Sequence, residues 1–458
     1  MYRSKDLDKY LNIIYAYSDK AEIYYEENLS KNYIYVSSNL KDIDTSYTNG
    51  FGIRLINDED FYLSSTENIN EEINKISKYF KKENKEELKF NEIEHLEDEG
   101  IITSTEDIKN FFNMLDKIIR SYSNLISQVD IRLSITRKTK TIINTNMNKK
   151  RYKTYKTRLM IETVAEKNNK KVNTHKTFGK TGGFELLSSY DFPKIAEEIA
   201  KVTVEKLDAI PFEGGNLPVV INKGFGAVII HESAGHALEA ESIRRGLSIF
   251  KDDLNKKVSS PLVTLVDDAS LPKLFGSSLI DDEGEKAREN VLIKEGILQN
   301  FLLDSYNGSK INMKTNASSR RESFLYRPTS RMSNTYLQNG DSKPEDIIKT
   351  IKYGLYLKEM GGGSVDPSTG NFNFYSTLPY LIENGKVTKL LEGVSVIGNS
   401  KEILSKISMV GNDLTFETGY CGASSGMIPV TIGQPTIKVD SILIGGSKWK
   451  NKNLWLIF

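Results

Sequence analysis

The chain has 458 residues, a length that typically divides into roughly two to four domains with hydrophobic cores of their own. Its 62 lysines and arginines balance its 61 aspartates and glutamates, and the formal net charge of +1 provides no overall field that would attract nucleic acid or an anionic membrane. The mean hydropathy is −0.41, and no apolar run approaches the roughly 18 residues that a membrane-spanning helix needs. Composition therefore argues against direct nucleic-acid binding and against membrane insertion.

The N-terminus and the cysteine content both predict a cytoplasmic protein. The first residues, from Met1 to Asp6, are charged, and the apolar segment and cleavage site of a signal peptide do not follow them. Cys421 is the single cysteine of the sequence, so an intrachain disulfide is impossible. We expect a soluble chain in a reducing compartment.

The first half of the chain mixes helices with antiparallel strands. Ser104 and Asp107 form a capping-box pattern, and apolar residues then repeat at steps of three and four up to Ile126, which predicts an amphipathic helix. A second helix is predicted from Asp191 to Leu207, with Pro193 in its first turn. Apolar runs and alternating patterns predict strands at 52–56, 61–65, 131–135 and 155–161.

Residues 211–218 contain two prolines and two glycines, and we place a domain boundary there. The prediction is an α+β protein of two domains, a mixed helix and antiparallel-sheet domain at 1–210 and a largely antiparallel β domain at 219–458. Hairpin patterns at 292–298 and 381–387, the latter with an Asn-Gly turn, support the second domain. Helices are predicted there at 344–360 and 401–409.

The second domain also carries a candidate metal-binding helix, predicted over 224–241. It contains His231-Glu232-Ser233-Ala234-Gly235-His236, an H-E-x-x-x-H pattern. On a regular α-helix a five-residue step separates two side chains by about 140°, so both histidines face one metal only if the helix is locally widened. We therefore predict a π-helical distortion at 231–236, with Gly235 as its soft point.

Two histidines are too few for a catalytic zinc site, which usually has three protein ligands. The candidates for the third ligand are Glu239, Glu241 and Cys421. Glu232, beside the first histidine, is suited to take a proton from a water molecule. The alternative is that both histidines are hydrogen-bonded core residues and that the cysteine is a small buried apolar side chain.

Residues 422–426 read Gly-Ala-Ser-Ser-Gly, a literal G-x-S-x-G pattern. A nucleophile elbow needs a histidine later in the chain, and none follows His236. The sequence therefore does not support a serine hydrolase.

Around these residues the sequence resembles the TldD/PmbA family, which is also labelled as modulators of DNA gyrase. The resemblance extends over nearly the whole chain and covers the H-E-x-x-x-H segment together with several long motifs in the family's order. These motifs lie at 49–54, 229–239, 281–284, 327–335, 361–367 and 433–436.

The resemblance implies a zinc metallopeptidase of the TldD-like type, because the PmbA-like members lack the histidine motif and look like non-catalytic partners. It implies that His231, His236 and Cys421 hold one zinc ion per chain and that Glu232 is the general base. The family commonly has lysine and glutamine shortly after its cysteine, and this sequence departs from that pattern at 423–426.

The expected function is zinc-dependent hydrolysis of peptide bonds in unfolded or short peptides held in an enclosed cleft. Gly361, Gly362 and Gly363, which lack side chains, are a candidate substrate-binding wall of that cleft. The resemblance favours a homodimer or a heterodimer with a PmbA-like paralogue. The alternative function is that of a non-catalytic subunit or regulator of such a complex.

Overall fold

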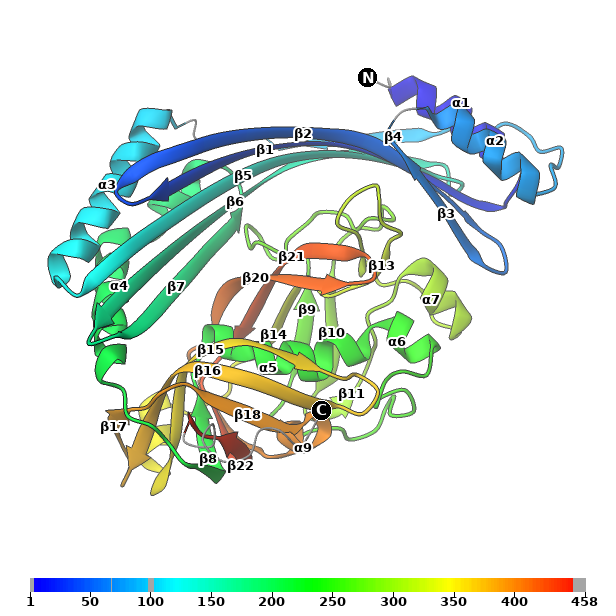
Figure 1. Cartoon of the computed structure of the whole chain (residues 1–458). Helices are drawn as coiled ribbons and strands as arrows, with labels where there is room; N and C mark the ends of the chain where they lie inside the picture. Colours follow the sequence, from blue (N-terminus) through cyan, green and yellow to red (C-terminus); the bar gives the residue numbers. More distant parts are fainter. Residues whose placement is uncertain (1–3, 67, 98–102, 448–458) are drawn as a thin grey trace.

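The computed structural model describes residues 4–66, 68–97 and 103–447. Figure 1 shows a long curved sheet, built from the first part of the chain, that arches over the strands and short helices of the second part. Helices and mostly antiparallel strands are mixed throughout, which confirms the predicted α+β class. Among the described residues, no helix is both long and apolar enough to cross a bilayer.

The arch is a sheet with the order β3-β2-β1-β5-β6-β4, in which β7 also pairs with β6. The strands β1, β2, β5 and β6 contain 17 to 20 residues each, so the sheet extends well beyond one packed core. All neighbours pair antiparallel except β4 with β6. The bounds are β1 (Lys20–Val36), β2 (Asn39–Ile56), β3 (Asp60–Ser65), β4 (Asn91–Leu96), β5 (Ile126–Asn144), β6 (Asn148–Lys167) and β7 (Lys170–Thr181).

Two pairs of helices cover the two ends of this sheet (Figure 1). They are α1 (Ser4–Tyr15) with α2 (Ile69–Tyr79), and α3 (Thr105–Tyr122) with α4 (Phe192–Glu205). The capping box of Ser104 and Asp107 begins α3, and the side chain of Asp191 caps α4, as the sequence predicts. Phe112 and Ile119 of α3 are fully buried against the sheet, so each end has its own hydrophobic core.

The second part of the chain contains two further sheets. One has the order β11-β10-β9-β14-β21-β20, and the other has the order β15-β8-β22-β18-β16-β17 with β19 paired to β22. The first is built from β9 (Leu265–Asp268), β10 (Glu289–Lys294), β11 (Ile297–Leu298), β14 (Asn334–Leu337), β20 (Thr415–Ala423) and β21 (Gly426–Gln434). The second is built from β8 (Gly214–Ile221), β15 (Tyr353–Val365), β16 (Asn371–Glu383), β17 (Lys386–Leu390), β18 (Val394–Asn399), β19 (Ile407–Val410) and β22 (Ile437–Gly445).

One large hydrophobic core joins these two sheets and encloses the segment with the histidine motif. This segment contacts strands of both sheets, namely β14, β15, β20 and β21. Both predicted hairpins are confirmed as β10–β11 and β16–β17, and Asn384 and Gly385 adopt the positive φ values that their turn requires. The remaining short elements are β12 (Ser319–Arg320), β13 (Thr329–Ser330), α6 (Ala240–Arg244), α7 (Ser305–Lys310), η1 (Phe184–Ser188) and η2 (Lys206–Asp208).

The helix predicted at 344–360 is wrong beyond its first turns. A short helix, α8 (Pro344–Lys349), is followed by the strand β15, which pairs with β8 on one side and β16 on the other. Ile347, Ile351 and Leu355 have helical spacing, but pairing with two distant strands overrides this local pattern. The helix predicted at 401–409 is shortened to α9 (Ser400–Ser405), because the next residues form β19.

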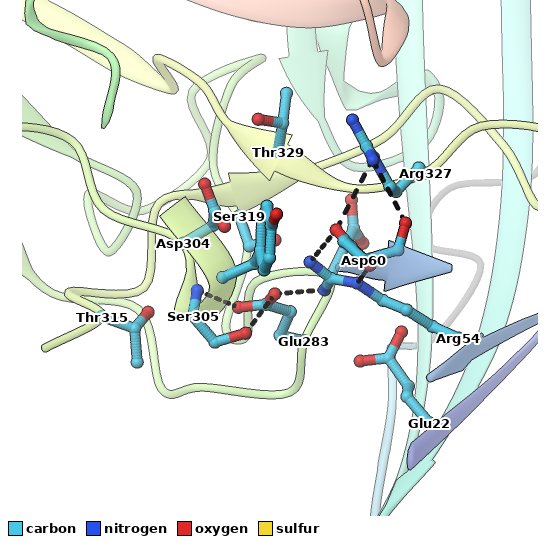
Figure 2. Close-up of polar contacts among 12 residues, drawn as sticks. Glu22, Arg54, Asp60, Glu283, Asp304, Ser305, Thr315, Ser319, Arg327 and Thr329 are labelled. Atoms are coloured by element: carbon cyan, nitrogen blue, oxygen red, sulfur yellow. Dashed lines mark hydrogen bonds and ion pairs between the residues drawn. The ribbon is translucent and has the colours of Figure 1, made fainter. Parts of the chain in front are cut away.

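A buried ionic network attaches the arch to the second part of the chain (Figure 2). Arg54 of β2 donates two hydrogen bonds to Asp60, at 2.7 and 2.8 Å, and a third to Glu283. Ser305 donates to the same Glu283 carboxylate through its backbone N–H at 2.9 Å and its hydroxyl at 2.7 Å. The concave face of the sheet is thereby held above the candidate site.

Candidate metal centre

The segment that carries the histidine motif is an irregular helix. It consists of η3 (Gly224–Ala227), α5 (Val228–Ile230), a π-helical turn η4 (His231–Gly235) and η5 (His236–Leu238). The backbone N–H of His236 donates to the carbonyl of His231, five residues earlier. The predicted π-helical distortion is confirmed, and it turns both imidazoles toward one point.

Gly235 has a packing role in this turn. A β-carbon at this position would lie 1.9 Å from Sδ of Met332, which packs against the helix from the loop between β13 and β14. The backbone φ at Gly235 is −53°, so the requirement is for close approach and not for an unusual conformation. A glycine therefore lets the widened turn pack closely on the loop that leads into β14.

Cys421 on β20 completes the cluster. Its Sγ lies 3.3 Å from Nε2 of His231 and 3.1 Å from Nε2 of His236. These three side chains form a group whose potential ligand atoms all lie within 4.8 Å of one another. A thiolate and two imidazole nitrogens that converge in this way suit zinc and other late first-row metals. The structure thus brings together the three residues that the family resemblance implies as ligands.

The electrostatics of the cluster favour a thiolate. Burial alone would raise the pKa of Cys421, but the adjacent His231 and His236 lower it to about 3. Burial likewise disfavours the charged form of His236, whereas Glu239 and Cys421 raise its pKa well above the usual value. A metal ligand must be deprotonated, so the depressed thiol pKa prepares Cys421 for coordination.

The three glutamates of the segment have different positions. The Glu232 carboxylate lies 3.7 Å from Nε2 of His236, on the metal side of the ring, and its side chain is 23% exposed. Glu239 contacts the opposite nitrogen, Nδ1 of His236, at 3.1 Å. Glu241 accepts hydrogen bonds from Ser424 at 2.7 Å and from Thr329 at 3.2 Å. Glu239 and Glu241 are therefore directed away from the point where the cluster converges.

Sequence reasoning missed Arg331, which contacts both the backbone of Cys421 and the side chain of Glu239. Arg331 is fully buried, donates to the backbone carbonyl of Cys421 at 2.7 Å and lies 3.5 Å from the Glu239 carboxylate. It belongs to a segment that the family resemblance covers, but no local spacing ties it to the histidines. Only the fold places its guanidinium between the cysteine backbone and the glutamate.

The three glycines of the predicted cleft wall lie on β15. Gly361 and Gly362 line a cavity of about 900 Å³, together with Phe225 of η3 and Tyr420 of β20. The cluster residues themselves do not line this cavity, although Tyr420 precedes Cys421 in the chain. Gly363 pairs with Phe374 of β16. A role of these glycines in substrate binding stays a prediction.

Three family models match consecutive parts of the chain. They are described as PmbA/TldA metallopeptidase domain 1, central domain and C-terminal domain, and they match residues 21–81, 100–207 and 214–446. The last two meet near the predicted boundary at 211–218, whereas the first part is divided into two. The two-domain division itself stays a prediction.

Relatives with curated names give the same family. A metalloprotease TldD homolog of Buchnera aphidicola from Schizaphis graminum is 30% identical over 94% of this chain and 93% of that protein. A metalloprotease TldD homolog of Haemophilus influenzae is 38% identical over 63% of this chain and 62% of its own length. A zinc metalloprotease TldD homolog of Saccharolobus solfataricus is 28% identical over 63% and 64% of the two chains. The chain thus spans less than two thirds of the latter two proteins.

Solved structures share the fold. A Thermotoga maritima protein named as a modulator of a DNA gyrase covers 96% of this chain and 99% of its own, with a TM-score of 0.79 and 16% identity. TldE from Thermococcus kodakarensis covers the same share of this chain, and 99% of its own, with a TM-score of 0.74 and 18% identity. Together with the family models and the full-length relative, these matches establish that the chain belongs to the PmbA/TldD metallopeptidase family.

Proposed function

We propose that this chain is a zinc-dependent metallopeptidase that hydrolyses peptide bonds in short or unfolded peptides. The observation that carries the proposal is the convergence of His231, His236 and Cys421, with the Glu232 carboxylate 3.7 Å from one of the proposed ligand atoms. The S. solfataricus relative is named a zinc metalloprotease, which supports zinc as the metal. One zinc ion per chain would be held by the two Nε2 atoms and the thiolate.

The residues of the site divide the chemistry between them. A bound zinc ion supplies a Lewis acid that polarises the scissile carbonyl and lowers the pKa of water. Glu232 accepts the proton of the attacking water and passes it to the nitrogen of the leaving amine. Glu239, hydrogen-bonded to Nδ1 of His236, fixes the orientation of that ring so that Nε2 faces the cluster.

The strand that carries Cys421 also suits peptide binding. Among the described residues β20 pairs only with β21, and β7 contacts it at Gly179, whose carbonyl accepts a hydrogen bond from Thr418 at 3.2 Å. Beyond Thr418, toward Cys421, the second edge of β20 has no strand partner among these residues and can pair with an extended backbone. Binding through backbone hydrogen bonds at a sheet edge tolerates many side chains, which fits short or unfolded peptides as substrates.

We further propose that the chain acts in the cytoplasm, as a homodimer or with a PmbA-like paralogue.

A Glu232→Gln variant tests the proposal. The amide keeps the shape of the side chain but cannot accept a proton, so peptide cleavage should fall by roughly 10²- to 10⁴-fold while the zinc content stays unchanged. Cleavage of a quenched fluorescent peptide library and elemental analysis of the same samples provide the two readouts. Cleavage at the native rate by a zinc-loaded variant would contradict the assignment.

Glu241→Gln is the matched control, because this carboxylate lies in the same segment but is hydrogen-bonded to Ser424 and Thr329. It should retain both zinc and activity. If the native chain holds no zinc, cleaves no peptide and associates stably with a second protein, the alternative of a non-catalytic subunit would replace the proposal.

A further inference from the structure

The cavity of about 900 Å³ lies between two strand edges, β7 of the arch and β20 of the second part, and β15 forms another wall. Seven cationic side chains and three carboxylates line it, a local surplus of four positive charges. The whole chain has a formal net charge of only +1. The cavity is therefore far more basic than the protein as a whole.

Several of these cations lack a carboxylate partner. Among the described residues, Arg158, Lys206 and Lys358 form no ion pair within 4.0 Å. The Arg158 guanidinium lies 5.3 Å from the ring centre of Tyr420, and its Nε is buried without a hydrogen-bond partner. Lys206 donates to the backbone carbonyl of Asn173 at 3.0 Å. These groups can receive the carboxylate of a ligand.

The acidic side chains of the cavity do not cancel these cations. Glu359 is paired with Lys176 at 2.8 Å, and Glu392 lies 3.8 Å from Lys170, so both carboxylates have their own counter-ions. Glu417 is the third carboxylate of the lining. Lys223 is paired with Asp413, 3.8 Å away and outside the lining. Among the described residues, four lining cations without an ion pair therefore face one such carboxylate, that of Glu417.

The cavity is aligned with the metal cluster along β20. Glu417 packs against Gly224 at the start of the irregular helix, where a β-carbon would meet its carboxylate at 2.7 Å. Four residues later Cys421 meets the two histidines farther along the same helix. Residues 417–420 of β20 line the cavity and the next residue, Cys421, belongs to the cluster. Four residues of a strand span about 13 Å, so an extended peptide along β20 passes from the cavity to the cluster within about four residues.

We propose that this cavity binds carboxylate groups of the peptide substrate, within about four residues of the scissile bond, and that the enzyme prefers acidic peptides. The inference rests on the proposed peptidase function and names its substrate class. Arg158 is the central residue, because its planar guanidinium can bind a carboxylate through two hydrogen bonds while it stacks on Tyr420. Lys206 and Lys358 add long-range attraction.

The carboxylate has two possible sources, an acidic side chain or the free C-terminus of the peptide. Four labelled versions of one peptide distinguish them: aspartate or asparagine at one position within about four residues of the scissile bond, each with a free or an amidated C-terminus. Binding is measured by fluorescence anisotropy on the zinc-loaded Glu232→Gln protein, which should bind the peptide without cleaving it. This readout does not depend on cleavage.

We expect the aspartate peptide, the free-acid peptide or both to bind about tenfold more tightly than the neutral amide. Arg158→Gln and the double variant Lys206→Gln/Lys358→Gln should each remove most of this preference. Lys117→Gln, at an exposed position of α3 outside the cavity, should leave it intact. With the unaltered cavity the preference should also shrink between about 0.05 M and about 0.5 M salt, a readout that needs no cavity variant.

Equal binding of all four peptides would overturn the inference, as would a preference that Arg158→Gln, Lys206→Gln/Lys358→Gln and salt leave unchanged. The outcome is separable from that of the proposed function. A native enzyme that cleaves neutral and acidic peptides equally retains the peptidase proposal and contradicts the cavity proposal. A chain that binds acidic peptides through Arg158 but cleaves no peptide retains the cavity proposal and contradicts the peptidase proposal.

Discussion

Two buried polar clusters of this protein differ in how their groups are satisfied. Around Arg54, donors and acceptors match: Asp60 and Glu283 receive hydrogen bonds from the guanidinium, and Ser305 supplies two more to Glu283 (Figure 2). In the metal cluster, two imidazole nitrogens and a thiol sulfur converge instead, and the buried Nδ1 of His231 has no partner among the described residues. The carboxylates of the first cluster have guanidinium counter-ions in Arg54 and Arg327, whereas the second cluster is suited to a cation.

The contrast assigns different roles to similar burial. Arg54 and Asp60 are 1% and 2% exposed, and Cys421 and His231 are both 4% exposed. A saturated buried ion pair is expensive to break from one side, since the remaining charge is left without compensation. A residue of a convergent ligand set can be substituted without such a penalty, and the consequence is loss of the metal. Substitutions in the first cluster should therefore reduce stability, and substitutions in the second should reduce metal content and activity.

The largest effect is expected for Cys421→Ser. Serine preserves the size of the side chain but replaces a thiolate with a neutral hydroxyl, so the set loses its soft, charged ligand. Zinc should fall from about one ion per chain to a small fraction, and peptide cleavage should fall by roughly a thousandfold or more. Elemental analysis and library cleavage of the purified variant measure both.

Cys421→Ser also decides the identity of the third ligand. If the variant retains stoichiometric zinc, Glu239 or Glu241 must complete the site and the thiolate is excluded. The urea unfolding midpoint of the zinc-free forms of both proteins is the control, and it should change little.

The sequence predicts the two histidines because they are neighbours on one segment, and it also predicts the need for a widened helix. The third residue is harder to find, because Cys421 lies 185 residues after His236 and meets it only through the pairing of β20 with β21. Without the family resemblance, Glu239 and Glu241 are candidates for the third ligand beside Cys421. Arg331 gives no local signal at all, since its role exists only in three dimensions.

The next largest effect is expected for Arg54→Met. This variant leaves the buried carboxylate of Glu283 without an ion-pair partner and Asp60 with only the distant Arg327, which should lower the free energy of unfolding by about 3–5 kcal/mol. Urea unfolding measures the loss, and the remaining folded protein should still bind zinc. The matched control is Arg327→Met, because Arg327 lies 3.6 Å from the same Asp60 but is 39% exposed. Its cost should be below about 1 kcal/mol, and equal losses would contradict a locking role of the network.

A smaller, pH-dependent effect is expected for Lys140→Met. Burial would raise the pKa of Asp282, but Lys140, 2.6 Å away, and Arg321 lower it to about 2. Because this folded pKa lies below the unfolded value near 3.9, the stabilisation is complete above about pH 4 and is lost as the pH falls toward about 2. The free energy of unfolding of the native chain should exceed that of the variant by roughly 2 kcal/mol at pH 7, and this difference should shrink in acid.

Urea unfolding of both proteins between pH 7 and the lowest pH at which they remain folded measures this difference. Taking the difference cancels the buried carboxylates with raised pKa values, such as Asp267, which lie in both proteins. A gap between the two proteins that is constant with pH would show that Lys140 acts through packing and not through its charge.

The fold shows the same division between local and distant information. Helix caps and the Asn-Gly hairpin are local devices, and the structure confirms the capping box of Ser104 and the turn at Asn384. The strand β15 is different, because Ile347, Ile351 and Leu355 follow a helical step while two distant strands provide the pairing that decides the outcome. Local spacing does not predict the structure of a segment whose pairing strands are remote in the sequence.

The smallest effect is expected for Glu239→Gln, which lies where the two kinds of cluster meet. Glu239 contacts Nδ1 of His236 at 3.1 Å and Arg331 at 3.5 Å, so it belongs to a neutralised pair and also orients a proposed ligand. The amide keeps an acceptor for the imidazole N–H but loses the charge, and zinc affinity should fall by about tenfold, about 1.4 kcal/mol. Competition with a chelator of known affinity measures this change. Complete loss of zinc would instead make Glu239 a ligand, and an unchanged affinity would mean that the ring is held by packing alone.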